Sequence, residues 1–512
     1  MAAGVTHREH RRLLPGSARQ RFIVAGACFP PIAYALCIWH YAVNAPFQDD
    51  WSVAPLVSNA LHGRLTLTEL WQQHSEARLV VPNLFYSGFG FINHLNLRSI
   101  VIFNACLFVA TFILMLTLFR IYTKRPLTFL RVLSLGIVWF SLIGVDNALW
   151  AFQLAWYLAL LLLFVMIHLL LVWPRNRKLA LGLALLAAIA ASLSMVQGFL
   201  LWPVGLVCLL WVWSRERKRY GEVAVWLMTA LLTTQFYLHG YKSGVGCVPL
   251  GTDCSLGANA SHPILLAKFF LTLVANAVPV RVYYRHLAFI QLRVGFVQLL
   301  GAALCIAAAF VIVRSLQERS DDKRVPLPLL LIVFALLFDL TIALGRTNEG
   351  ISAAFQGRFT MPSLLLLVGI IAYACGHLPH PRAVRMHADS HGYAVVAFLV
   401  LGMLISYQGI VGTQYGLRVA RVQRSAEVLN ARTAVNLDLI PRVEQGCYAS
   451  VYVWNRVIAP PAAILKLRRA LVIPRQDHLI VFEPGTYRKY RAEGPPKPPR
   501  GCLAKIGVNV AP

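Results

Sequence analysis

The stretch LRSIVIFNACLFVATFILMLTLFR at residues 97–120 decides the class of fold, because its only charges, Arg98 and Arg120, lie close to its ends. A helix needs about 20 predominantly apolar residues to cross a bilayer, so this stretch is predicted to span a membrane. The whole chain of 512 residues has the same character, with 58% hydrophobic and 13% charged residues and a mean hydropathy of +0.62. Soluble domains carry about 25% charged residues, which excludes an ordinary soluble enzyme.

Two further groups of apolar segments extend this interpretation. The stretches 79–96 and 264–290 are interrupted by polar residues and are predicted to be interfacial or re-entrant. We therefore predict an all-α polytopic membrane protein with about 11 transmembrane helices. The ten segments that meet or approach the same criterion are 22–42, 128–145, 150–173, 179–195, 198–213, 223–239, 291–314, 326–345, 361–378 and 392–412.

The formal charge of +27 is explained by membrane topology. Basic clusters lie at alternate ends of the predicted helices, as the positive-inside rule requires, and this favours topology over a nucleic-acid partner. The chain is predicted to lie in a bacterial inner membrane with a cytoplasmic basic tail (1–21), a transmembrane domain (22–412) and an external, periplasmic C-terminal region (413–512). The clusters are Arg8, Arg11, Arg12, Arg19 and Arg21; Arg120, Lys124, Arg125 and Arg131; Arg175, Arg177 and Lys178; Arg215, Arg217, Lys218 and Arg219; Arg314, Arg319, Lys323 and Arg324.

Two external regions carry the cysteines outside the apolar segments. Cys247 and Cys254 are close enough in sequence to form a disulfide in an oxidising compartment, although two free thiols are equally compatible with the spacing. In the C-terminal region, the alternating runs Cys447–Trp454 and Leu479–Phe482 are typical of short strands. We expect a small external α/β appendage there.

The first external loop is the strongest candidate for chemistry. It spans 43–96 and includes PFQDDW, in which Asp49 and Asp50 follow the first helix directly. Repulsion between adjacent carboxylates raises a pKa and favours a general base, and the pair can also hold a divalent cation such as Mg or Mn. Alternatively, the two aspartates only cap the helix that begins near Trp51.

Further polar residues are predicted at the same membrane face. Arg358 opens an apolar helix, where an unpaired cation is costly, so it calls for an anionic partner such as a phosphate; an ion pair with Glu349 is the alternative. Arg346, Lys242 and Arg78 are candidates to assist it. The other predicted cleft residues, some of which can equally be surface ion pairs, are His74, Glu76, Asp146, Gln153, Gln197, His239 and Glu349.

Four segments resemble motifs of one group of membrane enzymes. FQDDW followed by QQHSEARLVVPNL, DNALWAFQLAWYL, MVQGFLLWPVGL and GRFTMPSLLL occur in the order seen in the bacterial, lipid-linked-sugar-dependent branch of the GT-C glycosyltransferase superfamily. Together they cover about 40–380. Ser75 and Ala77 replace the more usual Asn and His of one motif, and Gln197 stands where Asn is common.

The resemblance implies an inverting glycosyltransferase that uses a polyprenyl-phosphate sugar donor at the external face, beside membrane lipids. It also implies an acidic base or metal ligand in the first external loop, at Asp49 or Asp50. The alternative from another class is a transporter or flippase for a lipid-linked or anionic glycan, in which ionisable groups lie near the bilayer midplane. Asp339 is the main deep acid. A non-catalytic membrane scaffold is the third hypothesis.

Overall fold

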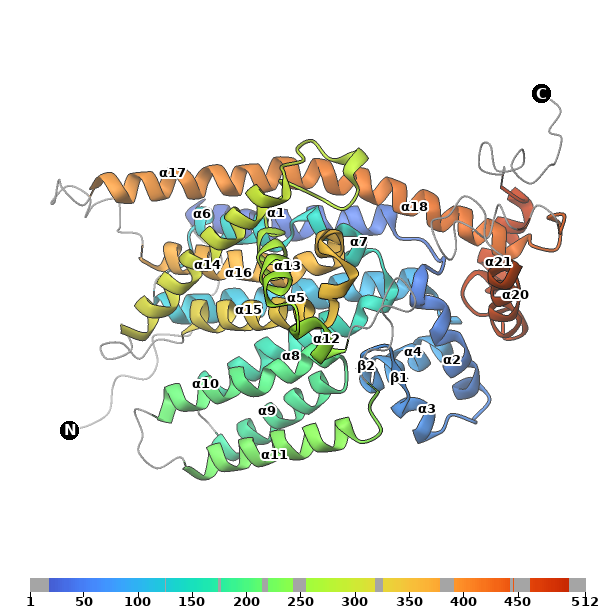
Figure 1. Ribbon diagram of the computed structural model, residues 1–512, viewed down its shortest axis with the longest axis horizontal. Coiled ribbons are helices and arrows are strands. Elements are labelled where there is room, and N and C mark those ends of the chain that lie inside the picture. The colour runs from blue at the N-terminus through green and yellow to red at the C-terminus, as the bar shows by residue number, and fades with distance from the viewer. Residues whose placement is uncertain are drawn as a thin grey trace.

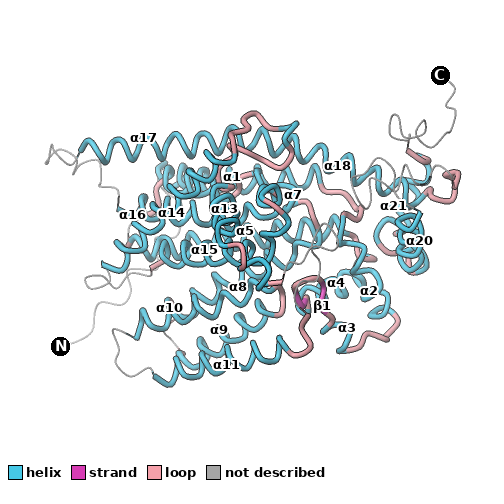
Figure 2. Tube along the Cα trace, viewed as in Figure 1, coloured by secondary structure: helices cyan, strands magenta, loops and turns pink. Residues whose placement is uncertain are grey.

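The computed structural model describes residues 18–124, 126–173, 176–213, 220–242, 255–317, 326–377, 391–442, 445 and 461–496. Within this part the protein is almost entirely helical, and its one sheet is a two-stranded antiparallel hairpin formed by β1 (Gln73–His74) and β2 (Ala77–Arg78) (Figure 2). Most of the long helices run roughly along the long axis of the molecule, and the short helices of the first external loop gather at one end (Figure 1).

Six helical segments of the described chain are long and apolar enough to cross a membrane. They carry few charges because a charged side chain is costly in the hydrocarbon core, and they are helical because a helix bonds its own backbone there. The chain is therefore a multi-pass membrane protein. The six segments are Leu97–Thr123 (α5), Phe129–Ala148 (α6 to α7), Ala151–Leu171 (η3 and α8), Val294–Gln317 (α14), Leu327–Glu349 (α15 and η7) and Gly357–His377 (η9 and α16).

The remaining five predicted spans are also helices. The eleven-span count stays a prediction, because several of them are shorter than the bilayer requires or adjoin residues outside the described part. They are α1 (Ala18–Tyr41), α9 (Arg177–Ser192), α10 (Leu201–Trp213), α11 (Tyr220–Leu238) and α17 (His391–Tyr407).

The two interrupted apolar stretches form short helices. α4 covers Val80–Asn93 and α13 covers Pro263–Ala275. At 1.5 Å per residue each is about 20 Å long, which is less than the roughly 30 Å hydrocarbon core, so neither spans it alone. The other short helices and turns are η1 (Gln48–Val53), α2 (Ala54–Leu61), α3 (Leu67–Trp71), η2 (Leu142–Gly144), α7 (Val145–Ala148), η4 (Val196–Leu200), α12 (Leu256–Ala260), η5 (Arg285–Leu287) and η8 (Ile351–Phe355).

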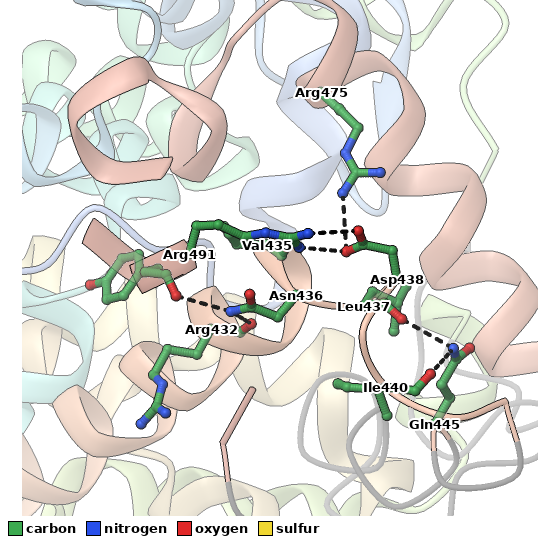
Figure 3. A network of polar contacts seen from close by, with 10 residues as sticks. Arg432, Val435, Asn436, Leu437, Asp438, Ile440, Gln445, Arg475 and Arg491 are labelled. Carbon is green, nitrogen blue, oxygen red and sulfur yellow. Dashed lines mark hydrogen bonds and ion pairs between the residues drawn. The ribbon is translucent and has the colours of Figure 1, made fainter. Parts of the chain in front are cut away.

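The C-terminal region continues α17, the last of the predicted spans. α17 passes through a π-helical turn at Gln408–Gly412 directly into α18 (Thr413–Val435), so no break in the backbone separates it from the predicted transmembrane domain. α20 (Pro461–Gln476) and α21 (Pro484–Glu493) lie beside the end of α18, which Figure 3 shows in detail.

The strand predicted at Leu479–Phe482 is wrong. The structure has a 3₁₀ turn, η11 (Ile480–Phe482), and all four side chains from Leu479 to Phe482 are buried. The Ile480 N–H donates to the carbonyl of His94, in the first external loop, and not to a neighbouring strand. The described part of the C-terminal region is thus helical and not α/β, while Cys447–Trp454 lies outside the described residues.

Long-range hydrogen bonds fix which helix ends lie together. Asn44, just after α1, accepts from the Leu97 N–H at the start of α5 and donates to the carbonyl of Ile480. Arg120, in the last turn of α5, is therefore at the opposite end of the molecule from the first external loop. The predicted segregation of basic clusters from the external loop is physically consistent with this arrangement.

Candidate functional site

A cavity of about 380 Å³ opens where the first external loop meets the helix ends on the same side. Its wall combines the turn after α1, the β1–β2 hairpin, the start of α8, the α9–α10 connection, the last turn of α15 and the start of α16. Seven of the predicted site residues line it, from segments far apart in the sequence. They are Asp49, His74, Glu76, Gln153, Gln197, Arg346 and Arg358.

Asp49 and Asp50 have different environments although they are adjacent. Asp49 lines the cavity, and the side chain is about half exposed. Asp50 is 2% exposed, and its two carboxylate oxygens accept the backbone N–H groups of Phe47 at 2.8 Å and Phe152 at 2.9 Å. Burial raises the pKa of Asp50 to about 8, against the lowering effect of those two bonds. Asp50 thus lies in the first turn of η1, which begins at Gln48 and not near Trp51, and joins the external loop to the residues before α8, whereas Asp49 faces the cavity.

The β-hairpin brings two predicted residues to the cavity. β1 and β2 pair through His74 and Ala77, and the backbone of Ser75 adopts the left-handed conformation that this tight connection requires. The His74 Nε2 atom lies 3.9 Å from an Asp49 carboxylate oxygen, and its ring packs against Phe152 with 4.8 Å between centroids. His74 thus lies between the acid and the aromatic wall.

Arg346 is held by two carboxylates. Its Nη1 donates to Glu349 at 2.6 Å, and its Nη2 donates to Glu76 in the hairpin. The pair with Glu76 joins the end of α15 to the first external loop. Because both neighbours are anionic, the positive charge of Arg346 is already compensated within the protein.

Arg358 forms no ion pair within the described residues, although the carboxylates of Glu349, Glu76 and Asp49 lie near enough to act on its charge. Its Nε atom is buried without a hydrogen-bond partner among the described residues, and its guanidinium carbon lies 4.8 Å from the ring centroid of Phe359. Two more residues of the cavity wall carry buried polar atoms without a partner, Trp150 Nε1 and Gln153 Oε1. Buried polar atoms are nearly always hydrogen-bonded, so three such atoms in the residues of one cavity wall are unusual.

Six of the predicted residues do not line the cavity, and two of these have clear structural roles. The Arg78 guanidinium donates to the backbone carbonyls of Trp71, Tyr237 and His239, so it holds the loop to the end of α11 and is not available to a phosphate. Glu349 bonds Arg346 from behind the wall. The six residues are Asp50, Arg78, Lys242, Asp146, His239 and Glu349.

Asp146 lies close behind the cavity. A Cβ atom added at Gly357 would be 2.1 Å from Asp146 Oδ1, so this aspartate occupies the space that a side chain at 357 would need. Gly357 is therefore required for α7 to approach the start of α16. Lys242 and His239 contribute only backbone contacts here: Gln73 bonds both the N–H and the carbonyl of Lys242, and Arg78 bonds the carbonyl of His239.

Several lining residues were not predicted as site residues. The apolar part of the wall includes Trp150, Phe152 and Trp156, and the last turn of α15 adds Thr341 and Gly345. Aromatic residues at a membrane end are usually interfacial anchors, so their positions in the sequence did not distinguish them. Here the three rings give the cavity flat apolar faces beside its charged groups.

The aspartate pair does not fit a shared divalent cation. Asp49 lines the cavity, whereas Asp50 is buried outside it and bonds the backbone of Phe47 and Phe152, so the two carboxylates do not face one ion in the cavity. Among the described residues no group of three or more His, Cys, Asp or Glu side chains is placed to hold a metal ion. Cys247 and Cys254, the predicted disulfide, lie outside the described residues.

The chain has limited similarity to known proteins. No family model and no curated protein matches the chain. Two solved structures of the oligosaccharyltransferase from the archaeon Archaeoglobus fulgidus are similar: the apo form (12% identity, TM-score 0.42, 77% of this chain and 56% of that one) and the AglB complex with an inhibitory peptide and a dolichol-phosphate (14%, 0.41, 81% and 58%). This chain thus matches less than two thirds of either structure, and at these TM-scores the likeness fixes neither its fold family nor its activity.

Proposed function

We propose that the chain is an inverting GT-C-type glycosyltransferase that moves a sugar from a polyprenyl-phosphate donor to an envelope glycan, lipid or protein at the external face of the membrane. The observation that carries the proposal is a cavity at one end of a multi-pass helical protein, where Asp49, Arg358 and an aromatic wall meet. The Arg358 Nε atom has no hydrogen-bond partner among the described residues. The motifs that resemble this superfamily supply most of that wall.

The charged groups divide the chemistry between them. The Asp49 carboxylate accepts the proton of the acceptor hydroxyl while the hydroxyl oxygen forms a bond to the sugar C1. The bond from C1 to the phosphate oxygen breaks, and polyprenyl phosphate leaves with the electron pair. Arg358 stabilises the charge that develops on the phosphate, and a guanidinium can do this through two parallel hydrogen bonds.

The rest of the cavity positions the reactants. Sugar rings present apolar faces that pack on aromatic side chains, and Trp150, Phe152 and Trp156 offer such surfaces. Gln153 and Gln197 provide amide groups for sugar hydroxyls. Arg346 is already bonded to Glu76 and Glu349, so its role is to hold the hairpin in place and only secondarily to attract the phosphate.

The position of Asp339 supports this proposal over the transporter hypothesis. It is fully buried between α15 and α16, where the Ser363 hydroxyl bonds its carboxyl oxygens at 3.3 and 3.4 Å, and it does not line the cavity. A translocation path would instead expose such an acid to a central passage. The charged residues of the cavity lie at one end, which favours surface chemistry.

Mass spectrometry of envelope glycans from a deletion strain and its parent tests the proposal. A transferase predicts that one sugar substituent is missing in the deletion strain and that its lipid-linked donor accumulates. A flippase predicts loss of whole glycan units instead. Identical glycans in the two strains would contradict both functions.

A further inference from the structure

The loop at 280–293 closes on itself before α14 begins. The Leu292 N–H donates to the Val280 carbonyl at 3.0 Å, and Arg281 Nη1 donates back to the Leu292 carbonyl at 2.7 Å. Between them, Gln291 Nε2 donates to the Val282 carbonyl at 3.2 Å. The loop therefore has a defined shape, and the side chain of its own residue Val282 is buried.

The 280–293 loop packs near the junction of α17 and α18, where the sequence of the continuous helix changes from apolar to charged. α17 has no Asp, Glu, Lys or Arg, whereas α18, which continues it, has its first charge at Arg418. The Tyr407 hydroxyl donates to the Pro279 carbonyl at 3.1 Å, and Arg418 Nη1 donates to the Leu287 carbonyl at 3.4 Å. The loop also immediately precedes the membrane span Val294–Gln317. From these neighbours we infer that the loop lies near the boundary between hydrocarbon and headgroups.

The outer surface of the loop mixes apolar and basic side chains. Tyr283 is 48% and Phe289 45% exposed. Arg285 and Arg293 are exposed beside them, and the Arg418 guanidinium lies 4.0 Å from the Phe289 ring centroid. The loop contains no Asp or Glu, and within the described chain these three arginines form no ion pair.

We propose that this surface, formed by the 280–293 loop and Arg418, binds the anionic headgroups of phospholipids in the surrounding leaflet. Exposed aromatic rings beside arginines at the level of the headgroups are the combination that anionic lipids recognise, because the rings enter the interface while the guanidinium groups meet the phosphates. The positive-inside rule disfavours unpaired arginines at the external boundary, so a bound anion accounts for their presence there.

The bound lipid would lie next to the wall of the candidate site. The Arg281 guanidinium carbon is 5.4 Å from the ring centroid of Phe355, which closes η8 three residues before Arg358. The lipid surface is nevertheless separate from the cavity, because no residue of the 280–293 loop lines it. The proposal therefore stands independently of the glycosyltransferase assignment.

Native mass spectrometry of the detergent-solubilised full chain tests the proposal, with phosphatidylglycerol and phosphatidylcholine added separately. The wild type should bind phosphatidylglycerol in preference to phosphatidylcholine. Arg285→Gln/Arg293→Gln/Arg418→Gln should reduce phosphatidylglycerol affinity by at least about tenfold, since each arginine near an anionic surface contributes roughly fivefold. Replacing the same three residues by lysine should retain most of the affinity, because a headgroup responds to the charge. The double variant Arg285→Gln/Arg293→Gln leaves every described hydrogen bond of the loop side chains intact and gives the answer if the triple variant does not insert.

A matched variant and a second lipid exclude the alternatives. Arg469→Gln/Arg488→Gln/Lys489→Gln removes the same charge from α20 and α21 and should leave phosphatidylglycerol binding unchanged. Equal losses in the two triple variants would show general electrostatics and overturn the proposal, as would unchanged binding in the loop variants. If the loop variants lose polyprenyl phosphate and keep phosphatidylglycerol, the surface belongs to the substrate path and the proposal is wrong.

Discussion

At the scale of single residues, the adjacent Asp49 and Asp50 have different surroundings that the sequence does not distinguish. Sequence reasoning placed both in the site, and only the bond from the distant Phe152 N–H shows that Asp50 faces the protein interior. The role of Arg78 is hidden in the same way, since the carbonyls that accept from its guanidinium include those of Tyr237 and His239. Such long-range partners leave no local signal in the sequence.

The buried Asp50 predicts a pH dependence of stability. Its pKa is about 8 in the folded protein and 3.8 ordinarily, so the folded state keeps a proton that the unfolded chain releases. The stabilising contribution is fully present below about pH 4 and is lost as the pH rises through about 8. Thermal unfolding midpoints of the detergent-solubilised protein should fall over this window, and Asp50→Asn should flatten the decline. An equally steep decline in Asp50→Asn would show that another group is responsible.

Arg358 should be needed for transfer and not for folding. Arg358→Gln removes the guanidinium that faces the developing phosphate charge, and transfer should fall by about 100-fold, the usual effect of removing one preorganised donor. Initial rates with a synthetic polyprenyl-phosphate sugar measure this. Arg64→Gln, an exposed arginine of the same external loop, is the control and should keep wild-type rates. Wild-type activity in Arg358→Gln would remove Arg358 from the mechanism.

At the scale of elements, several contacts hold α21 to the end of α18, and two of them compare a buried with an exposed interaction. Asn436 is fully buried and its Nδ2 donates to the Tyr490 carbonyl at 2.9 Å. Asp438 accepts two bonds from Arg491, at 2.7 and 2.9 Å, and also meets Arg475 at 3.8 Å (Figure 3). The pKa of Asp438 is lowered by these bonds to Arg491, yet its side chain is about half exposed.

These two contacts should differ in energetic weight. Asn436→Ala leaves a buried carbonyl unpaired and should lower the free energy of unfolding by about 1–3 kcal/mol. Asp438→Asn breaks a solvent-screened ion pair and should cost about 1 kcal/mol or less. Chemical denaturation followed by proteolysis within α21 compares them. A larger loss in Asp438→Asn would mean that the network, and not the buried amide, holds the helix.

The sequence predicted the secondary structure correctly for the apolar spans, where a helix is the structure that lets a segment bond its own backbone. Each predicted span coincides with a helix, because a long apolar segment in a bilayer must bond its own backbone. The prediction of a strand failed at Leu479–Phe482. All four side chains of this run are buried, so its apolar character does not distinguish a strand from the 3₁₀ turn that forms there.

At the scale of the whole molecule, the cavity forms where the first external loop and the ends of several helices meet on one side of the protein. Its charged residues come from the first external loop and from the ends of α15 and α16, more than 250 residues later. In the sequence, only the order and spacing of the motifs indicated that these segments lie together. The distances between their side chains, and the division into residues that line the cavity and residues that support it, required the three-dimensional structure.

The orientation of the molecule is the prediction that belongs to this scale. The cavity and the C-terminal helices should both be external, and the end of α5 that carries Arg120 should be cytoplasmic. Reporter fusions after residue 440 should behave as external, and fusions after 124 as cytoplasmic. A cytoplasmic signal from the 440 fusion would place the cavity on the wrong face for a lipid-linked donor.

The central claim is that Asp49 is the base in a sugar transfer. The most direct measurement is the rate of transfer from a labelled polyprenyl-phosphate sugar by purified wild type and Asp49→Asn, which keeps the size of the side chain and removes its basicity. We expect a loss of at least about 100-fold, the usual scale for a general base, with unchanged membrane insertion and thermal stability. Wild-type transfer by Asp49→Asn would contradict the account.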